Sequence, residues 1–218
     1  YRMQSKVILT TTLFLIIVPC IYFFVFEFED LPIEKRFFAS LFQAITPRTA
    51  GFNTVDLTLL SEAGIGIMIL LMLIGGSPGS TAGGMKTVTI VVLFCSTVAT
   101  IKNKSSATLF GRSISSDSIR KAVAVSMTFI TICFASTILL MAVSGASALD
   151  VMYEVVSATA TVGLSRNFTS GLNVSGKLII IATMYFGRVG PISLAVAVGS
   201  KNESQNVISE PTEEISIG

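Results

Sequence analysis

TATVGLS at Thr159–Ser165 and TPRTAGFN at Thr46–Asn53 are the two stretches from which the fold of this chain can be worked out. Each follows an apolar segment that is too short to cross a bilayer, and each precedes one that is long enough. The glycine in each stretch can adopt backbone dihedrals that other residues avoid, so consecutive carbonyls can face a common axis and replace the water around a bare cation. The pattern therefore predicts two pore loops.

The two loops supply the residues that we expect to line an ion filter. The second loop contains Thr-Val-Gly, which matches the start of the potassium-channel signature Thr-Val-Gly-Tyr-Gly but lacks its second glycine. One such match arises easily by chance in an apolar protein, whereas two copies in matching surroundings make chance a poor explanation. The predicted filter residues, with K+ bound at the level of the two glycines, are Thr49, Ala50, Gly51, Phe52, Thr161, Val162, Gly163 and Leu164.

The composition is that of a membrane protein. The 218 residues are 51% hydrophobic and 13% charged, with a mean hydropathy of +0.78, which is more apolar surface than a soluble domain of this size can bury. Histidine is absent, which removes the usual zinc ligand and the usual general base. We therefore expect a multi-pass protein of the plasma membrane, in contact with the lipid bilayer, with no enzymatic activity, no covalent cofactor and no nucleic-acid partner.

The distribution of positive charge decides the course of the chain between the two loops. GGSPGSTAGG at 75–84 separates two apolar segments, so it is either a hairpin between two full spans or a break within one long helix. The segment 102–121 holds five Lys and Arg residues, and loops of this kind stay cytoplasmic. A second crossing before this segment would place its charges outside, so we predict a broken helix.

The predicted fold class is an all-α membrane protein built from tandem span–pore loop–span repeats, as in potassium channels. The first repeat covers 1–101, with a span at 7–26, a pore helix at 37–47, a filter at 48–54 and a broken second helix at 57–101. A cytoplasmic loop follows at 102–121. The second repeat covers 122–199, with a span at 122–145, a pore helix at 150–160, a filter at 161–166 and a second helix at 173–199, and a cytoplasmic tail covers 200–218.

The repeats are related by a shift of 112 residues, which places Gly51 on Gly163. Upstream of the glycines the match needs a further shift of one residue to bring Phe42 onto Tyr153, which leaves the register of the short helices open. Because a carbonyl filter takes four loops, the chain holds two repeats of an expected four. The other two would come from a missing N-terminal half or from another chain, and the start at Tyr1 favours the missing half.

A charged side chain in the last apolar segment points to a gate. Arg188 is the only charged residue between Leu178 and Val198, and an arginine near mid-membrane costs at least about 2.5 kcal/mol. We expect it to face the pore, with snorkelling to the cytoplasmic edge as the alternative. In the pore it would meet the glycine-rich stretch, and the predicted gate residues are Gly75, Gly76, Ser77, Gly79, Ser80, Thr81, Gly83, Gly84 and Arg188.

Together these motifs resemble those of the Trk/Ktr/HKT superfamily of potassium transporters, and most of all its bacterial KtrB-type membrane subunits. The resemblance is carried by FQAITPRTAGF at 42–52, GGSPGSTAGGMK at 75–86, and TVGLS at 161–165 with Phe186–Arg188. It implies four repeats around one pore, of which this chain would supply the third and fourth, one filter glycine per repeat, and an intramembrane gating loop facing an arginine. It also implies a homodimer with one pore per subunit, a cytoplasmic ring of nucleotide-binding regulatory subunits of the KtrA or TrkA type, K+ as transported ion and Na+ as a candidate coupling ion.

Three alternatives compete with potassium transport. The segment from Gly79 to Thr87 approaches a P-loop, but Met85 separates the second glycine from Lys86, so the lysine and the loop amides cannot converge on one phosphate. A purely structural membrane subunit would leave Arg188 and the paired loops without a cause. A sodium-permeable or poorly selective cation transporter of the same fold stays open, because one glycine per loop orders fewer carbonyls.

Overall fold

The structure, a computed structural model, describes residues 2–104 and 106–190, and this part of the chain is mostly helical. The helices are α1 Met3–Tyr22, continued by the π-helix η1 Phe23–Glu27, α2 Ile33–Ile45, α3 Glu62–Leu73, α4 Thr87–Ile101, α5 Ser116–Ser144, α6 Ala148–Thr159 and α7 Val174–Val189. Short 3-10 turns, η2 Leu57–Leu59 and η3 Thr169–Gly171, lie in the connections, and two strands, β1 Thr108–Leu109 and β2 Arg112–Ser113, form one hairpin.

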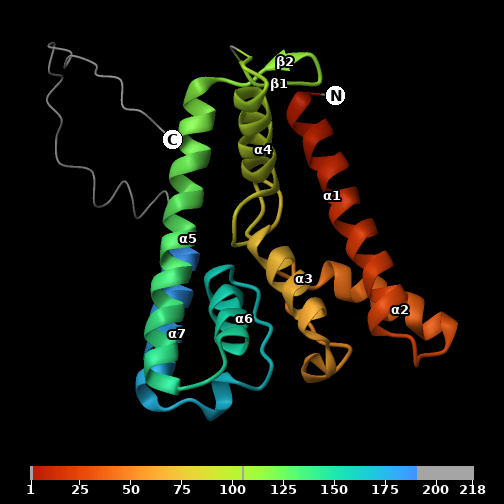
Figure 1. Ribbon diagram of the computed structural model, residues 1–218, viewed down its shortest axis with the longest axis vertical. Helices are drawn as coiled ribbons and strands as arrows, with labels where there is room; N and C mark the ends of the chain where they lie inside the picture. Colours follow the sequence, from red (N-terminus) through yellow and green to blue (C-terminus); the bar gives the residue numbers. More distant parts are fainter. Residues whose placement is uncertain (1, 105, 191–218) are drawn as a thin grey trace, which may run out of the picture.

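Two helices are long and apolar enough to cross a membrane. They are α1 with its π-helical extension, 25 residues in all, and α5 with 29 residues. Only 22% of the most apolar window of each is buried, and large side chains such as Phe14 and Phe134 are exposed along them. In Figure 1 these two helices stand on opposite sides of the protein, with α3, α4 and α6 between them. Apolar surface on this scale requires a hydrocarbon or protein environment.

The helices α3 and α4 follow one another end to end in Figure 1, separated by the glycine-rich stretch. The first of them begins later than the expected position 57, because residues Leu57–Leu59 form a 3-10 turn that the Asp56 side chain caps. The helix proper starts at Glu62, where the Ser61 hydroxyl accepts a hydrogen bond from the Gly64 N–H at 3.0 Å. Side-chain oxygens at such positions satisfy the free amides of a helix end.

Other boundaries also differ from the expected ones. The first short helix begins at Ile33 rather than 37, directly after Pro32, whose fixed φ of −53° leads into the helix. The second long span begins at Ser116 rather than 122, because the Ser115 hydroxyl caps it. The cytoplasmic loop expected at 102–121 therefore ends earlier, and it holds the short β1–β2 hairpin, an addition to an otherwise helical arrangement of the described residues.

The last helix, α7, ends at Val189, and Gly190 follows with φ of +86°. The remainder of the second helix expected at 173–199 and the tail expected at 200–218 lie outside the described residues.

The core surrounds the second short helix. Helix α6 packs against α5, α7 and α3, and it buries every residue from Tyr153 to Thr159. Met68 and Met72 of α3 and Phe129 of α5 complete the largest apolar cluster around it. Helix α2 packs against α1 and buries only three of its residues. The loop that follows α6 is thus held by a packed core, while the loop that follows α2 lies at an edge.

Candidate functional site

The two predicted filter loops meet through their backbones. A Cβ atom built on Gly51 would lie 2.2 Å from the carbonyl oxygen of Val162 and 3.9 Å from the Cα atom of Gly163. No real side chain fits at the first of these distances, so glycine at position 51 is what lets the loops approach. Two glycines that are far apart in the sequence therefore share one place in the fold.

Both loops repeat the same unusual backbone pattern. Thr49 and Gly51 have φ of 69° and 75°, and Thr161 and Gly163 have φ of 55° and 88°. Left-handed backbone is rare for a β-branched residue such as threonine, and it costs on the order of 1–3 kcal/mol. Left-handed residues at alternate positions let successive carbonyls turn to a common side, as a carbonyl-lined cation site requires. Strain of this kind, present twice, is typical of a functional loop.

A hydroxyl at the tip of each short helix fastens the far end of its loop. The Thr46 hydroxyl donates to the carbonyl of Phe52 at 2.6 Å and accepts from the N–H of the same residue at 3.1 Å. The Ser157 hydroxyl donates to the carbonyl of Leu164 at 2.6 Å. These equivalent contacts span six residues in the first loop and seven in the second, which accounts for the one-residue shift in the repeat.

A buried carboxylate stands behind the second loop. Glu154 of α6 is only 4% exposed, and its two oxygens accept hydrogen bonds from three groups. The donors are the Ser165 hydroxyl, the Arg166 N–H at 3.2 Å and the Thr169 hydroxyl at 3.1 Å. An ionised carboxylate is an acceptor with room for all three donors, so the chain just beyond the filter is firmly placed.

Arg166 connects the second loop to the first repeat. Its guanidinium forms an ion pair with Asp150 and donates to the carbonyls of Leu57 at 3.1 Å and Thr58 at 3.5 Å. The 3-10 turn η2, which contains Leu57 and Thr58, is also held by Asp56, because the hydroxyl and the N–H of Thr58 donate to its carboxylate. These two hydrogen bonds hold the pKa of the Asp56 carboxyl below its usual range.

The first loop has a different residue at the position of the carboxylate. Gln43 is fully buried on α2, and its amide nitrogen lies 3.1 Å from the sulfur of Met68. Its amide oxygen has no hydrogen-bond partner within the described ranges. Sulfur is a weak acceptor, so this bracing is much poorer than that of the second loop.

The two ends of the predicted gating loop are joined by backbone hydrogen bonds between the end of α3 and the start of α4. The Gly75 N–H donates to the carbonyl of Met85 at 2.9 Å, and the Met85 N–H donates to the carbonyl of Leu73 at 3.1 Å. Between these contacts lie the predicted gate residues Gly75, Gly76, Ser77, Gly79, Ser80, Thr81, Gly83 and Gly84. A Cβ atom on Gly83 would lie 2.3 Å from the carbonyl oxygen of Ala160, so the loop touches the inner end of the second filter.

Arg188, in the last turn of α7, contacts this loop. Its guanidinium donates to the carbonyl of Thr81 at 2.8 Å. The same side chain lines a groove beside the second filter, together with Thr161 and Gly163, and a cavity of about 450 Å³ along the loop. The structure thus places Arg188 in contact with the predicted gating loop and beside the second predicted filter loop.

The structure adds residues that the motifs did not single out as functional. Lys86 donates through its ammonium group to carbonyls of the gating loop, and Glu154 and Arg166 brace the second filter. A charge inside a short apolar helix, as at Glu154, was the one sequence signal that could have found that residue. The bridge from Arg166 to Leu57 spans 109 residues and leaves no local trace in the sequence.

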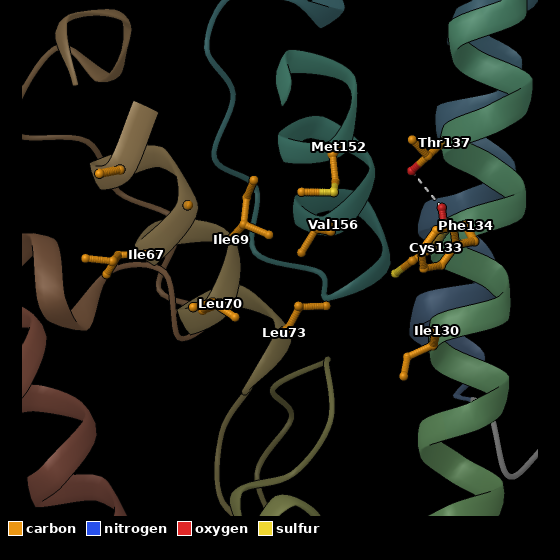
Figure 2. A pocket seen from close by; sticks show the side chains of 12 residues that line it. Ile67, Ile69, Leu70, Leu73, Ile130, Cys133, Phe134, Thr137, Met152 and Val156 are labelled. Atoms are coloured by element: carbon orange, nitrogen blue, oxygen red, sulfur yellow. Dashed lines mark hydrogen bonds between the residues drawn. The ribbon is translucent and has the colours of Figure 1, made fainter. Parts of the chain in front are cut away.

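A larger hollow, of about 580 Å³, lies between α3, α5 and α6 (Figure 2). It is lined by Met152 and Val156, on the face of α6 that looks away from Glu154 and the second filter. Its lining is almost wholly apolar, and the Thr137 hydroxyl is already used, because it donates to the carbonyl of Cys133 at 2.7 Å. A cation would lose its hydration there without replacement, so this groove does not suit an ion path.

Comparisons with known proteins agree with this geometry. Residues 2–210 match the model of the TrkH family, described as a cation transport protein. The chain is 37% identical over 213 residues to the Ktr system potassium uptake protein B of Bacillus subtilis, and this match covers 95% of the chain and 48% of the relative. It is 34% identical over 226 residues to the potassium/sodium uptake protein NtpJ of Enterococcus hirae, covering 99% of the chain and 50% of the relative.

A solved structure has the same fold. The potassium transporter TrkH from Vibrio parahaemolyticus superimposes with a TM-score of 0.73 at 19% sequence identity, covering 87% of this chain and 43% of that one. The chain therefore spans about half the length of the relatives and of the structure that it matches.

Proposed function

The chain belongs to the TrkH family of cation transport proteins, and from this premise we propose that it forms two of the four pore loops of a potassium pathway across the plasma membrane. One observation carries the proposal. The backbones of the two loops touch at Gly51 and Val162, next to Gly163, with the same left-handed pattern in each. A pair of strained, carbonyl-rich loops in an apolar protein suits the coordination of a dehydrated cation.

The ion is held by backbone carbonyls and no covalent chemistry takes place. K+ lies at the level of Gly51 and Gly163, with the carbonyls of the neighbouring filter residues replacing its water. Two loops leave half of the ion's surroundings open, and Phe52 is 71% exposed beside them. The first two repeats, from the same polypeptide or from another chain, complete the ring.

The glycine-rich loop and Arg188 form the gate on the cytoplasmic side of the filter. Gly83 abuts the end of the second filter, and Arg188 holds Thr81 from across the groove. A fixed positive charge at this point slows a departing cation, and the loop has to move before the ion can leave.

Partners follow from the family resemblance. The complete transporter is a homodimer with one pore per subunit, and a cytoplasmic ring of nucleotide-binding subunits of the KtrA or TrkA type regulates it. Na+ is the candidate coupling ion. The basic segment 102–121, at the same end of Figure 1 as the N-terminus, faces this ring.

A second candidate is a pathway that also carries Na+. It is favoured by the relative whose printed name is a potassium/sodium uptake protein, and by the single glycine in each loop. The two candidates share one filter and differ only in how strictly its carbonyls are placed.

The test is ion uptake by potassium-depleted cells that express the complete transporter and lack other potassium uptake. We expect saturable K+ and Rb+ uptake, and we expect Gly163→Ser to weaken discrimination against Na+. Gly171→Ser is the matched control, because Gly171 lies in the outer connection with ordinary backbone and open space around it. Uptake of neither ion would contradict the function, and unchanged selectivity in Gly163→Ser would contradict the filter assignment.

A further inference from the structure

We propose that Lys86 is a second positioning residue of the gate, and that Lys86 and Arg188 together act as tethered cations that hold three consecutive carbonyls of the loop in the closed position. This inference rests on the proposed transport function. It also gives a role to the lysine of the glycine-rich motif, which does not have the spacing of a phosphate-binding loop.

The contacts of Lys86 and Arg188 alternate along the loop. The ammonium group of Lys86 donates to the carbonyls of Ser80, at 3.2 Å, and Ala82. The guanidinium of Arg188 donates to the carbonyl of Thr81, which lies between them in the sequence, at 2.8 Å. Both side chains line the same cavity along the loop. Three successive carbonyls are thus bound by two side-chain cations that share one cavity.

These carbonyls are chemically suited to K+ itself. Backbone carbonyl oxygens replace the hydration shell of K+ in a filter, and they lie here one residue from Gly83, which touches the filter's inner end. An ion that leaves the filter would meet oxygens already occupied by a charge of the same sign. The loop therefore offers the ion no coordination until Lys86 and Arg188 release it.

The position of Lys86 is unfavourable without the loop. Lys86 immediately precedes the first turn of α4, where the helix dipole repels a positive charge. Among residues 2–104 and 106–190, neither Lys86 nor Arg188 has a carboxylate within 4.0 Å. The loop carbonyls are thus the groups that compensate the Lys86 charge in this conformation, and the charge in turn stabilises the closed loop.

The direct test is Lys86→Met in the complete transporter. Methionine keeps most of the length of the side chain and loses its charge and donors, and Lys86 makes no side-chain hydrogen bond that caps α4. We expect the initial rate of Rb+ uptake, normalised to transporter in the membrane, to rise roughly threefold to tenfold, because two charge-assisted hydrogen bonds are lost. The ratio of K+ to Na+ uptake should stay unchanged, because the filter is not altered.

Four further variants make the test specific. Lys86→Arg keeps the charge and should restore a rate within about twofold of the unmodified protein. Arg188→Ala should also raise the rate, and the double variant with Lys86→Met should rise by less than the product of the two single effects, because both residues hold one loop. Lys177→Met, an exposed lysine at the outer start of α7, is the matched control.

The outcomes separate this inference from the function beneath it. If the unmodified transporter carries no ion, the proposed function fails. If it carries K+ while Lys86→Met transports at the same rate or more slowly at equal membrane abundance, only the role of Lys86 is overturned. Should Lys86→Met not reach the membrane, Lys86→Gln decides on the same criteria, because it removes the charge and keeps a donor.

Discussion

The two filter loops share one skeleton and differ in what supports it. Both alternate left-handed residues and both are fastened by a hydroxyl from the preceding helix tip. The second loop also has the three-donor carboxylate of Glu154 behind it and the Arg166 bridge beyond it. At the equivalent position, the first loop has only the Gln43 amide, which donates to the sulfur atom of Met68. The left-handed backbone pattern is common to both loops, while the side-chain contacts behind it differ.

The contact between the loops is itself unequal. Gly51 has no room for a side chain because the Val162 carbonyl lies against it, whereas a Cβ atom on Gly163 would meet nothing within 4 Å. The first loop, which has fewer supporting side-chain contacts, therefore packs at Gly51 against the carbonyl of Val162 in the better supported second loop. In this arrangement the second loop sets the position of both.

The largest expected effect comes from breaking that contact. Gly51→Ala adds a clash with backbone to the cost of left-handed dihedrals, together about 3 kcal/mol, so Rb+ uptake should fall about a hundredfold. Gly163→Ala adds only the dihedral cost, about 1 kcal/mol, and should lower uptake about fivefold. Initial uptake rates at matched membrane abundance give both values. Equal losses in the two variants would show that the loops do not touch as described.

A smaller effect should follow from the bracing itself. Glu154→Gln removes the charge that accepts three hydrogen bonds and puts an amide donor in place of one of the two oxygens, so we expect a loss of about 2 kcal/mol in stability together with weaker K+ over Na+ selectivity. Gln43→Leu removes a poor contact and an unpartnered oxygen, so the change should stay below about 1 kcal/mol. Thermal unfolding of the complete transporter in detergent measures the stability of both variants, and ion uptake measures their selectivity. A larger loss in Gln43→Leu would reverse the comparison.

The smallest effect concerns the hydroxyl contacts, where the first loop is the better fastened one. Thr46→Val removes two hydrogen bonds to Phe52 and should cost about 1.5 kcal/mol, while Ser157→Ala removes one bond to Leu164 and should cost about 1 kcal/mol. Thr97→Val, on the exposed face of α4, is the control for the substitution. Unfolding midpoints that rank Ser157→Ala as the more damaging variant would contradict these contacts.

Local sequence patterns were sufficient to single out those candidate site residues that depend on neighbouring residues. The filter glycines, the glycine-rich loop and the lone Arg188 all stand out from apolar surroundings, and the family match confirms the superfamily to which they pointed. The one-residue slip between the repeats was visible too. Its cause, an extra residue between Ser157 and Leu164, became visible only in the folded structure.

Contacts between distant segments could not be read from the sequence. Arg166 binds carbonyls of the first repeat, and no spacing rule connects an arginine to the backbone of a distant turn. In the sequence, Lys86 resembled part of an incomplete phosphate-binding motif. Only the folded loop shows that its ammonium group donates to the carbonyl of Ala82. Helix starts moved by several residues for a similar reason, since capping by Ser61 or Ser115 outweighed the onset of the apolar run.

The central claim is that the backbones at Gly51 and Gly163 jointly face one dehydrated cation. An experimental structure of the complete transporter soaked in Rb+ or Tl+, with anomalous scattering from the ion, tests it most directly. The account predicts an ion peak level with both glycines and enclosed by main-chain oxygens of both loops. Ion density elsewhere in the protein and none between these loops would contradict it.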